Sequence, residues 1–301
     1  MPEEESIQEP VGNGPRYNPI GFALFSLVVV FFLYQLIGGG LTIYFFGNAP
    51  TADQALIFRL ATMAAEFLFI LVPTYFLTRI QIGSWREFLR IRKTDWQYVI
   101  LAVVGVITLE QLLEVYLYFQ GLIPVPAPLD KFINQFQQAV EHTYKVLIAA
   151  HTPGEFLFVL LVVGLTPAIC EELLFRGLVQ SNFEMPMSRT KAIIWTGIIF
   201  GAYHLDPFTF VALCVLGIYF GYLVSTTGSI LVPMAAHFTN NFISAFVYYE
   251  SGRDSLIAPS GNQRVDPWYL IVWSVILAAA FVGTLYLTRK HHKETQEALE
   301  Q

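Results

Sequence analysis

Long apolar stretches separated by short polar segments follow one another along most of the chain. A helix needs about 20 predominantly apolar residues to cross the hydrocarbon core of a bilayer. Eight stretches approach or exceed this length, at residues 19–46, 55–79, 97–119, 155–182, 189–204, 207–226, 229–250 and 268–288. This pattern predicts an all-α fold, a polytopic membrane helix bundle of about eight transmembrane helices.

The segment between the third and fourth stretches has a different pattern. From Leu129 to Ala150, apolar side chains recur at helical spacing with charged side chains between them, and the apolar ones are Phe132, Phe136, Val140 and Tyr144. A helix with one apolar and one charged face lies in the plane of the membrane interface. We therefore expect an amphipathic helix on the membrane surface here.

The composition points to lipid as the solvent of this chain. Hydrophobic residues make up 55% and charged residues 13% of the sequence, whereas a soluble domain carries about 25% charge. No basic face with interleaved aromatic residues is present, so we expect no nucleic-acid partner. The two cysteines, Cys170 and Cys214, lie in apolar runs, which is typical of small packed residues and not of a disulfide framework.

The distribution of basic residues predicts the orientation. Three clusters of Lys and Arg lie at residues 79–93, 189–191 and 289–293, and the loop at residues 48–53 has no basic residue. Short cytoplasmic loops carry the excess of Lys and Arg. All three clusters fall on one side if both termini are cytosolic, which agrees with an even number of spans. We expect an integral membrane protein, in the plasma membrane of a prokaryote.

Ionisable side chains inside a membrane span are costly and are therefore functional candidates. Three such clusters stand out, and their members are Glu171, Glu172 and Arg176 on the fourth stretch, His204 on the fifth, and His237 and Asn241 on the seventh. Residues four apart share a helix face, so Glu172 can pair with Arg176, and His237 and Asn241 can act at one point. Glu171 points about 100° away from Glu172 and has no local partner.

The spacing also predicts which clusters meet. A turn near Met185 joins the fourth and fifth stretches, with Glu171 about 15 residues before its centre and His204 about 17 after it. At about 1.5 Å per residue, an antiparallel hairpin places these two side chains within about 3 Å of the same depth. The match is weaker for His237, which lies roughly 12 Å from the cytosolic end of its stretch.

The three clusters follow the patterns EExxxR, FxxxH and HxxxN, in this order and in apolar helices. The matching residues are Glu171, Glu172, Arg176, Phe200, His204, His237 and Asn241. This combination resembles the CPBP family of intramembrane proteases, the Abi family, which includes the Rce1-like CAAX prenyl proteases (CAAX prenyl protease 2). The resemblance covers a CPBP-like catalytic core (155–245), and the apolar pattern divides the rest of the chain into a cytosolic tail (1–18), membrane helices with the amphipathic segment (19–150), and a last membrane helix with a basic tail (266–301).

The resemblance implies an intramembrane endopeptidase with a membrane-anchored protein or peptide as substrate. In the implied mechanism, Glu171 and His204 activate a water molecule, and Glu172 with Arg176 holds the site in shape. His237 and Asn241 stabilise the oxyanion, for which the amide offers an N–H at any pH and the imidazole offers one in either tautomer. This mechanism requires no cofactor.

Several alternatives remain open at this stage. Glu171, His204 and His237 are also a donor set for zinc in a metalloprotease, although no HExxH motif is present. Intramembrane Glu and His serve as proton relays in proton-coupled transporters, but the repeated halves of such transporters are missing. A non-catalytic scaffold or bacteriocin-immunity protein is the third alternative. Four more ionisable residues lie in the predicted spans without an assigned role, namely Arg59, Glu66, Glu110 and Glu114.

Overall fold

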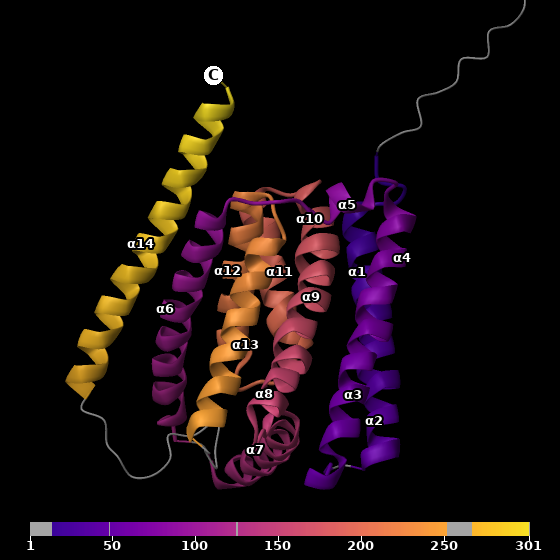
Figure 1. Ribbon diagram of the computed structural model, residues 1–301, viewed down its shortest axis with the longest axis vertical. Coiled ribbons are helices and arrows are strands. Elements are labelled where there is room, and N and C mark those ends of the chain that lie inside the picture. The colour runs from indigo at the N-terminus through magenta and orange to yellow at the C-terminus, as the bar shows by residue number, and fades with distance from the viewer. Residues whose placement is uncertain (1–13, 48, 125, 252–266, 301) are drawn as a thin grey trace, which may run out of the picture.

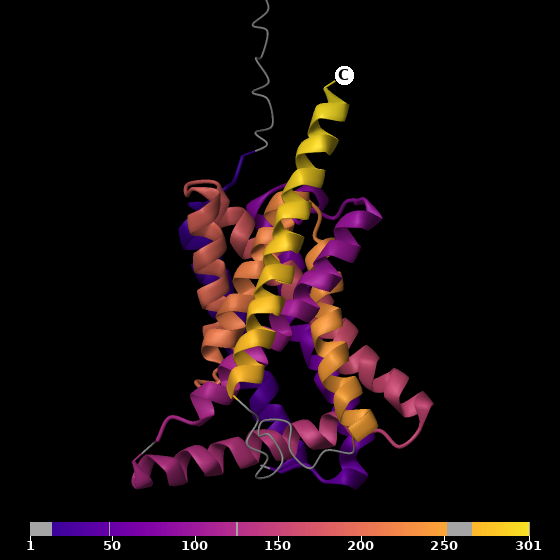
Figure 2. The same ribbon diagram turned by 90° about the vertical axis from the view of Figure 1, so that its left-hand side faces the viewer.

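The computed structural model describes residues 14–47, 49–124, 126–251 and 267–300, and this part of the chain contains helices and no strands. Part of the predicted tail at residues 1–18 lies outside it. The long helices pack side by side, and one helix crosses them at one end (Figures 1 and 2). The all-α polytopic membrane bundle predicted from the sequence is confirmed.

The first part of the chain forms three long helices, two of which contain a π-helical stretch. The first consists of α1 (Pro19–Phe31), π-helical Phe32–Gly38 and α2 (Gly39–Phe46). After a 3-10 turn (Ala52–Gln54), the second consists of α3 (Ala55–Glu66), π-helical Phe67–Leu71 and α4 (Val72–Gln81). The third is α6 (Trp96–Gly121). The short helix α5 (Trp85–Phe88) precedes α6, and the helix α7 (Ala127–Ile148) follows it.

The second part begins with another long helix that contains two π-helical stretches. Its segments are α8 (Pro153–Val159), π-helical Leu160–Leu165, α9 (Thr166–Glu172), π-helical Leu173–Gln180 and α10 (Ser181–Glu184). The remaining helices are α11 (Arg189–Tyr203), α12 (Phe210–Thr227), α13 (Leu231–Ser251) and α14 (Pro267–Leu299).

Among the described residues, six helices are long and apolar enough to cross a membrane. The other two predicted spans correspond to α11 and α13. Helix α11 has 15 residues, fewer than the roughly 20 that a span needs, and α13 is less apolar because it carries His237, Asn240 and Asn241. In the view of Figure 1 both helices lie between α6 and α9. The count of eight spans therefore stays a prediction.

The described beginning and end of the chain lie at the same end of the bundle (Figure 1). The backbone N–H of Arg16, just before α1, donates to the carbonyl of Gln81 at the end of α4 over 3.0 Å. His291 near the end of α14 lies 2.9 Å from the Asp95 carboxylate at the start of α6. This is the arrangement expected if both termini share one side of the membrane, and the cytosolic assignment remains a prediction.

Polar contacts tie several helices together at this end. Gln81 of α4 donates to Asn182 of α10 over 2.8 Å. Ser181 of α10 donates to the carbonyl of Phe88 in α5 over 3.1 Å, and Arg90 forms an ion pair with Glu184. These contacts fix the cytosolic-side ends of α4, α5 and α10 relative to one another, under the predicted orientation.

The predicted amphipathic segment forms α7, which lies across the opposite end of the bundle (Figure 2). The guanidinium of Arg59 on α3 donates to the carbonyls of Leu147 at 2.8 Å and Val146 at 3.2 Å, and also to that of Ala149. A cation at the last carbonyls of a helix satisfies them and complements the helix dipole. This contact gives Arg59 a structural role, separate from the three sequence motifs. The side chain of Phe132 lies outside what the structure describes.

Glycines bring α11 and α12 into close contact. A Cβ atom on Gly217 would lie 2.9 Å from the Cα of Gly197, and one on Gly201 would lie 2.6 Å from the Sγ of Cys214. Small residues at helix interfaces let the backbones approach closely. The contact also leaves the Gly217 carbonyl accessible to a side chain from the central helix, as described below.

Candidate active site

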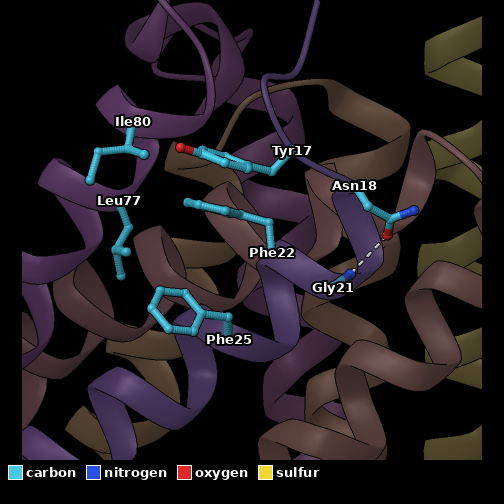
Figure 3. A pocket seen from close by; sticks show the side chains of 7 residues that line it. All are labelled: Tyr17, Asn18, Gly21, Phe22, Phe25, Leu77 and Ile80. Carbon is cyan, nitrogen blue, oxygen red and sulfur yellow. Dashed lines mark hydrogen bonds between the residues drawn. The ribbon is translucent and has the colours of Figure 1, made fainter.

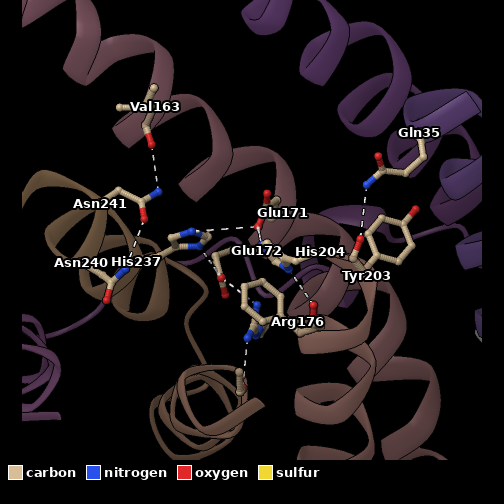
Figure 4. Close-up of polar contacts among 12 residues, drawn as sticks. Gln35, Val163, Glu171, Glu172, Arg176, Tyr203, His204, His237, Asn240 and Asn241 are labelled. Carbon is tan, nitrogen blue, oxygen red and sulfur yellow. Dashed lines mark hydrogen bonds and ion pairs between the residues drawn. The ribbon is translucent and has the colours of Figure 1, made fainter. Parts of the chain in front are cut away.

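Residues from three helices bring one carboxylate and two imidazoles together in the middle of the bundle (Figure 4). Glu171 lies on α9, His204 follows the last residue of α11, and His237 lies on α13. The Oε2 atom of Glu171 is 3.9 Å from Nε2 of His204 and 4.0 Å from Nε2 of His237. This oxygen is buried and has no hydrogen-bond partner, and both ring nitrogens lie within 4.0 Å of it.

Glu172 and Arg176 form a buried ion pair, as their spacing predicts. Arg176 Nη1 donates to Glu172 Oε1 over 2.8 Å, and neither side chain has exposed surface. The second arm of Arg176 donates to the carbonyl of Gly217 on α12 over 3.0 Å, and the guanidinium faces the ring of Phe200 at 4.5 Å. A buried charge is tolerated when it is paired and hydrogen-bonded in this way.

The same carboxylate oxygen of Glu172 also contacts the site, a contact that the sequence did not predict. It lies 2.9 Å from Nδ1 of His237. A carboxylate accepts hydrogen bonds, so Nδ1 carries the proton that points at Glu172. The His237 ring is further held by stacking against Phe220, with centroids 5.3 Å apart and planes 19° apart. Glu172 therefore orients His237 with Nε2 facing Glu171.

From the sequence, either tautomer of His237 is expected to offer an N–H to the site. The contact with Glu172 selects the tautomer with the proton on Nδ1, whose N–H points away from Glu171. With the proton on Nδ1, the neutral ring presents a lone pair at Nε2. Nε2 carries a hydrogen only in the doubly protonated imidazolium. His237 can therefore serve as an oxyanion donor only when it is doubly protonated.

His204 is held in a defined orientation by its own helix. Its Nδ1 lies 2.8 Å from the carbonyl of Phe200, one turn earlier. A carbonyl only accepts, so Nδ1 is the donor and Nε2 presents a lone pair toward Glu171. The side chains of His204 and Glu171 are 31% and 18% exposed, which makes this face of the site the accessible one.

Asn241 lies one helical turn after His237, and its position follows from a proline on the neighbouring helix. Its Nδ2 donates to the carbonyl of Val163 over 2.9 Å. In a regular α-helix the N–H four residues later would donate to that carbonyl, but Pro167 has no N–H. Asn240 donates to Oδ1 of Asn241 over 3.3 Å. One amide hydrogen of Asn241 remains free.

The two π-helical stretches of the central helix lie on either side of α9. Wide turns of this kind occur frequently at functional sites. Pro167 and Asn240 are the site residues that sequence reasoning missed. The proline was a usable signal, because it leaves the carbonyl of Val163 without its helical donor.

The remaining ionisable residues have different surroundings. Glu66 on α3 is 6% exposed and its Oε2 has no hydrogen-bond partner. It interacts electrostatically with Glu171, so it borders the site. Glu110 on α6 interacts with Ser244 of α13 and with Glu114. Glu110 and Glu114 are therefore not among the residues gathered around Glu171.

The donor types for zinc are present, but their spacing is wide. Ligands bound tetrahedrally at about 2.0–2.1 Å lie roughly 3.3–3.4 Å from one another. The Glu171 oxygen is 3.9 and 4.0 Å from the two imidazole nitrogens. Within the described part of the chain, no group of three or more His, Cys, Asp or Glu side chains is arranged to hold a metal ion. A zinc ion would need these three side chains to close in by about half an ångström.

Comparison with known proteins agrees with the geometry. Residues 153–243 match the model of the family described as type II CAAX prenyl endopeptidase Rce1-like. No curated protein and no solved structure matches the chain. The matched segment contains every residue of the three motifs and differs by two residues at each end from the predicted core at 155–245. Residues 153–243 are therefore similar to the Rce1-like family of membrane proteases, and the resemblance predicted from the sequence is confirmed for this segment.

Proposed function

We propose that the protein is an intramembrane endopeptidase that hydrolyses a peptide bond of a membrane-anchored protein or peptide. One observation carries this proposal. An unpartnered oxygen of Glu171 faces two imidazole nitrogens within 4.0 Å, in the core of an Rce1-like domain. The chain is an integral membrane protein, and the plasma membrane of a prokaryote is our proposal for its location.

Glu171 and His204 are both acceptors at the point where they face each other. A water molecule between them donates one hydrogen to Oε2 of Glu171 and the other to Nε2 of His204. Its lone pair is then free to attack a peptide carbonyl carbon. As the new C–O bond forms, one proton of the water passes to the Glu171 carboxylate, which acts as the general base.

The attack places negative charge on the former carbonyl oxygen. Donors that are already aimed at that oxygen stabilise it without reorganising. Here the donors are Nε2–H of the His237 imidazolium and the free amide hydrogen of Asn241. Glu172 accepts the hydrogen bond from Nδ1 of His237 and so fixes the ring, and Arg176 keeps Glu172 in place through their 2.8 Å contact.

Collapse of the tetrahedral intermediate breaks the C–N bond. The carbonyl re-forms as a carboxylic acid, and the proton held by Glu171 passes to the leaving nitrogen, which departs as an amine. Glu171 is ionised again and the site is ready for another water. In the zinc alternative, Glu171, His204 and His237 would hold the ion, which would supply an activated water.

The activity can be tested in cells that express either the wild-type protein or Glu171→Gln at equal levels. Labelling the protein N-termini of isolated membranes should reveal new termini with the wild type that are missing with the variant. A Glu110→Gln variant is the matched control, because it removes a carboxylate with a buried oxygen on α6 that the mechanism does not use. Identical terminus profiles for the wild type and Glu171→Gln would overturn the proposal.

A further inference from the structure

A second feature lies far from the motifs, on the outer surface between the start of α1 and the end of α4. It is a cavity of about 520 Å³, lined by Tyr17, Asn18, Gly21, Phe22, Phe25, Leu77 and Ile80 (Figure 3). Its volume is typical of a small-molecule site. The lining is almost entirely apolar, and nothing in the proposed peptide hydrolysis uses it.

The cavity has a firm floor and an exposed rim. Phe22 and Leu77 are 7% and 8% exposed and form the floor. Tyr17 stacks on Phe22 with ring centroids 5.7 Å apart, while Phe25 and Ile80 project at the edges. An apolar groove of this shape on a membrane helix pair suits a hydrocarbon chain and not a polar ligand.

Two arginines flank the groove. Arg16 directly precedes Tyr17, and Arg79 directly precedes Ile80. Both are exposed, and neither forms an ion pair with another described residue. Gln81 joins the two sides, because it accepts from the backbone N–H of Arg16 at 3.0 Å and of Tyr17 at 3.2 Å. Two exposed arginines without an ion-pair partner among the described residues therefore lie next to residues of the groove lining.

A second surface cavity provides a contrast. It has a volume of about 370 Å³ and lies between α6 and α14, where its lining includes Trp96, Ile100 and Lys290. Its charges are balanced within the protein, since Lys290 lies 3.8 Å from Glu294. The two grooves thus differ in charge while both lie on the outside of the bundle.

We infer that the groove between α1 and α4 binds an acyl chain of an anionic phospholipid, with the headgroup phosphate at Arg16 and Arg79. The groove supplies the apolar contact for the acyl chain. The arginines supply positive charge, which favours an anionic headgroup over a zwitterionic one. It lies at the basic end of the bundle, which the charge bias assigns to the cytosolic leaflet, where anionic lipids attract basic residues. This binding is independent of the proposed protease activity.

The test uses the purified full-length protein and native mass spectrometry, with phosphatidylglycerol and phosphatidylcholine titrated separately. The wild type should bind phosphatidylglycerol more tightly. Replacing each arginine should weaken this binding about fivefold, so Arg16→Gln with Arg79→Gln together should weaken it about 25-fold. Binding of phosphatidylcholine should change little.

Two further variants keep the test decisive. Ile80→Trp fills the groove from a position that is 44% exposed, so it spares the core and should reduce binding of both lipids. Lys290→Gln removes a positive charge at the balanced groove and should leave phosphatidylglycerol binding unchanged. Equal affinity for the two lipids, or equal losses in Lys290→Gln and the double arginine variant, would overturn the inference.

Discussion

Replacing Glu172 with Gln removes the one charge that both Arg176 and His237 contact. The side chains of Glu172 and Arg176 have no exposed surface, and their charged groups are 2.8 Å apart. With an effective dielectric constant of about 20, the attraction at that distance is about 6 kcal/mol. Some stabilisation of Arg176 survives, because its contacts with the carbonyl of Gly217 and the ring of Phe200 do not depend on Glu172.

We therefore expect a net loss of about 3–5 kcal/mol, which is the usual cost of breaking a buried ion pair by removing one partner. For a chain of this size the loss corresponds to a melting midpoint lower by roughly 10 °C. Thermal unfolding of the protein in lipid nanodiscs measures this shift. The matched control is Glu171→Gln, which keeps the shape of a neighbouring side chain that has no hydrogen-bond partner at Oε2.

Glu171→Gln should melt close to the wild type and abolish cleavage, because only the base is lost. If Glu172→Gln instead melts like the wild type and is inactive, while Glu171→Gln stays active, the roles of the two carboxylates are reversed. If both variants melt like the wild type, the ion pair does not support the fold and the argument from burial is wrong.

The other predictions concern the oxyanion donors and the metal. Asn241→Ala should lower turnover by about 10²–10³, the scale for one oxyanion donor, in an assay with an identified substrate; an unchanged rate would remove Asn241 from the mechanism. Pro167→Ala restores an N–H that competes for the carbonyl of Val163, so it should lower turnover while leaving the melting midpoint equal or higher. A strong chelator should leave the activity unchanged under the glutamate mechanism, whereas loss of activity that added zinc restores would establish the metal alternative.

The hairpin that brings Glu171 and His204 together could be predicted because one short turn joins the two helices that carry them. The depth of His237 relative to Glu171 could not be predicted. The rise per residue of a regular α-helix places His237 closer to the cytosolic end than Glu171, yet its Nε2 lies 4.0 Å from that carboxylate. The π-helical stretch Leu173–Gln180 lies between Glu171 and the turn, and its wider turns hold more residues per unit length than an α-helix. A uniformly apolar segment has no polar pattern that would mark a π-helical stretch in the sequence.

Contacts between distant helices escaped prediction for a different reason. The pairing of Glu172 with Arg176 follows from their spacing within one helix. The contact of Glu172 with His237 depends on how α13 is rotated about its axis, and that rotation is set by packing against the neighbouring helices. Asn240 and Asn241 are adjacent in the sequence, so a local pattern alone could not tell which of them faces the carbonyl of Val163.

The contact between Gly197 and Gly217 limits how this protein can move. Where the backbones approach so closely, no layer of side chains separates α11 from α12, so we expect this pair to resist the shear motion that packed helices often show. We therefore expect His204 at the end of α11 to move together with the Gly217 carbonyl that accepts from Arg176. If the protein admits a polypeptide, as its proposed function requires, we expect helices outside this pair to move while His204 keeps its position.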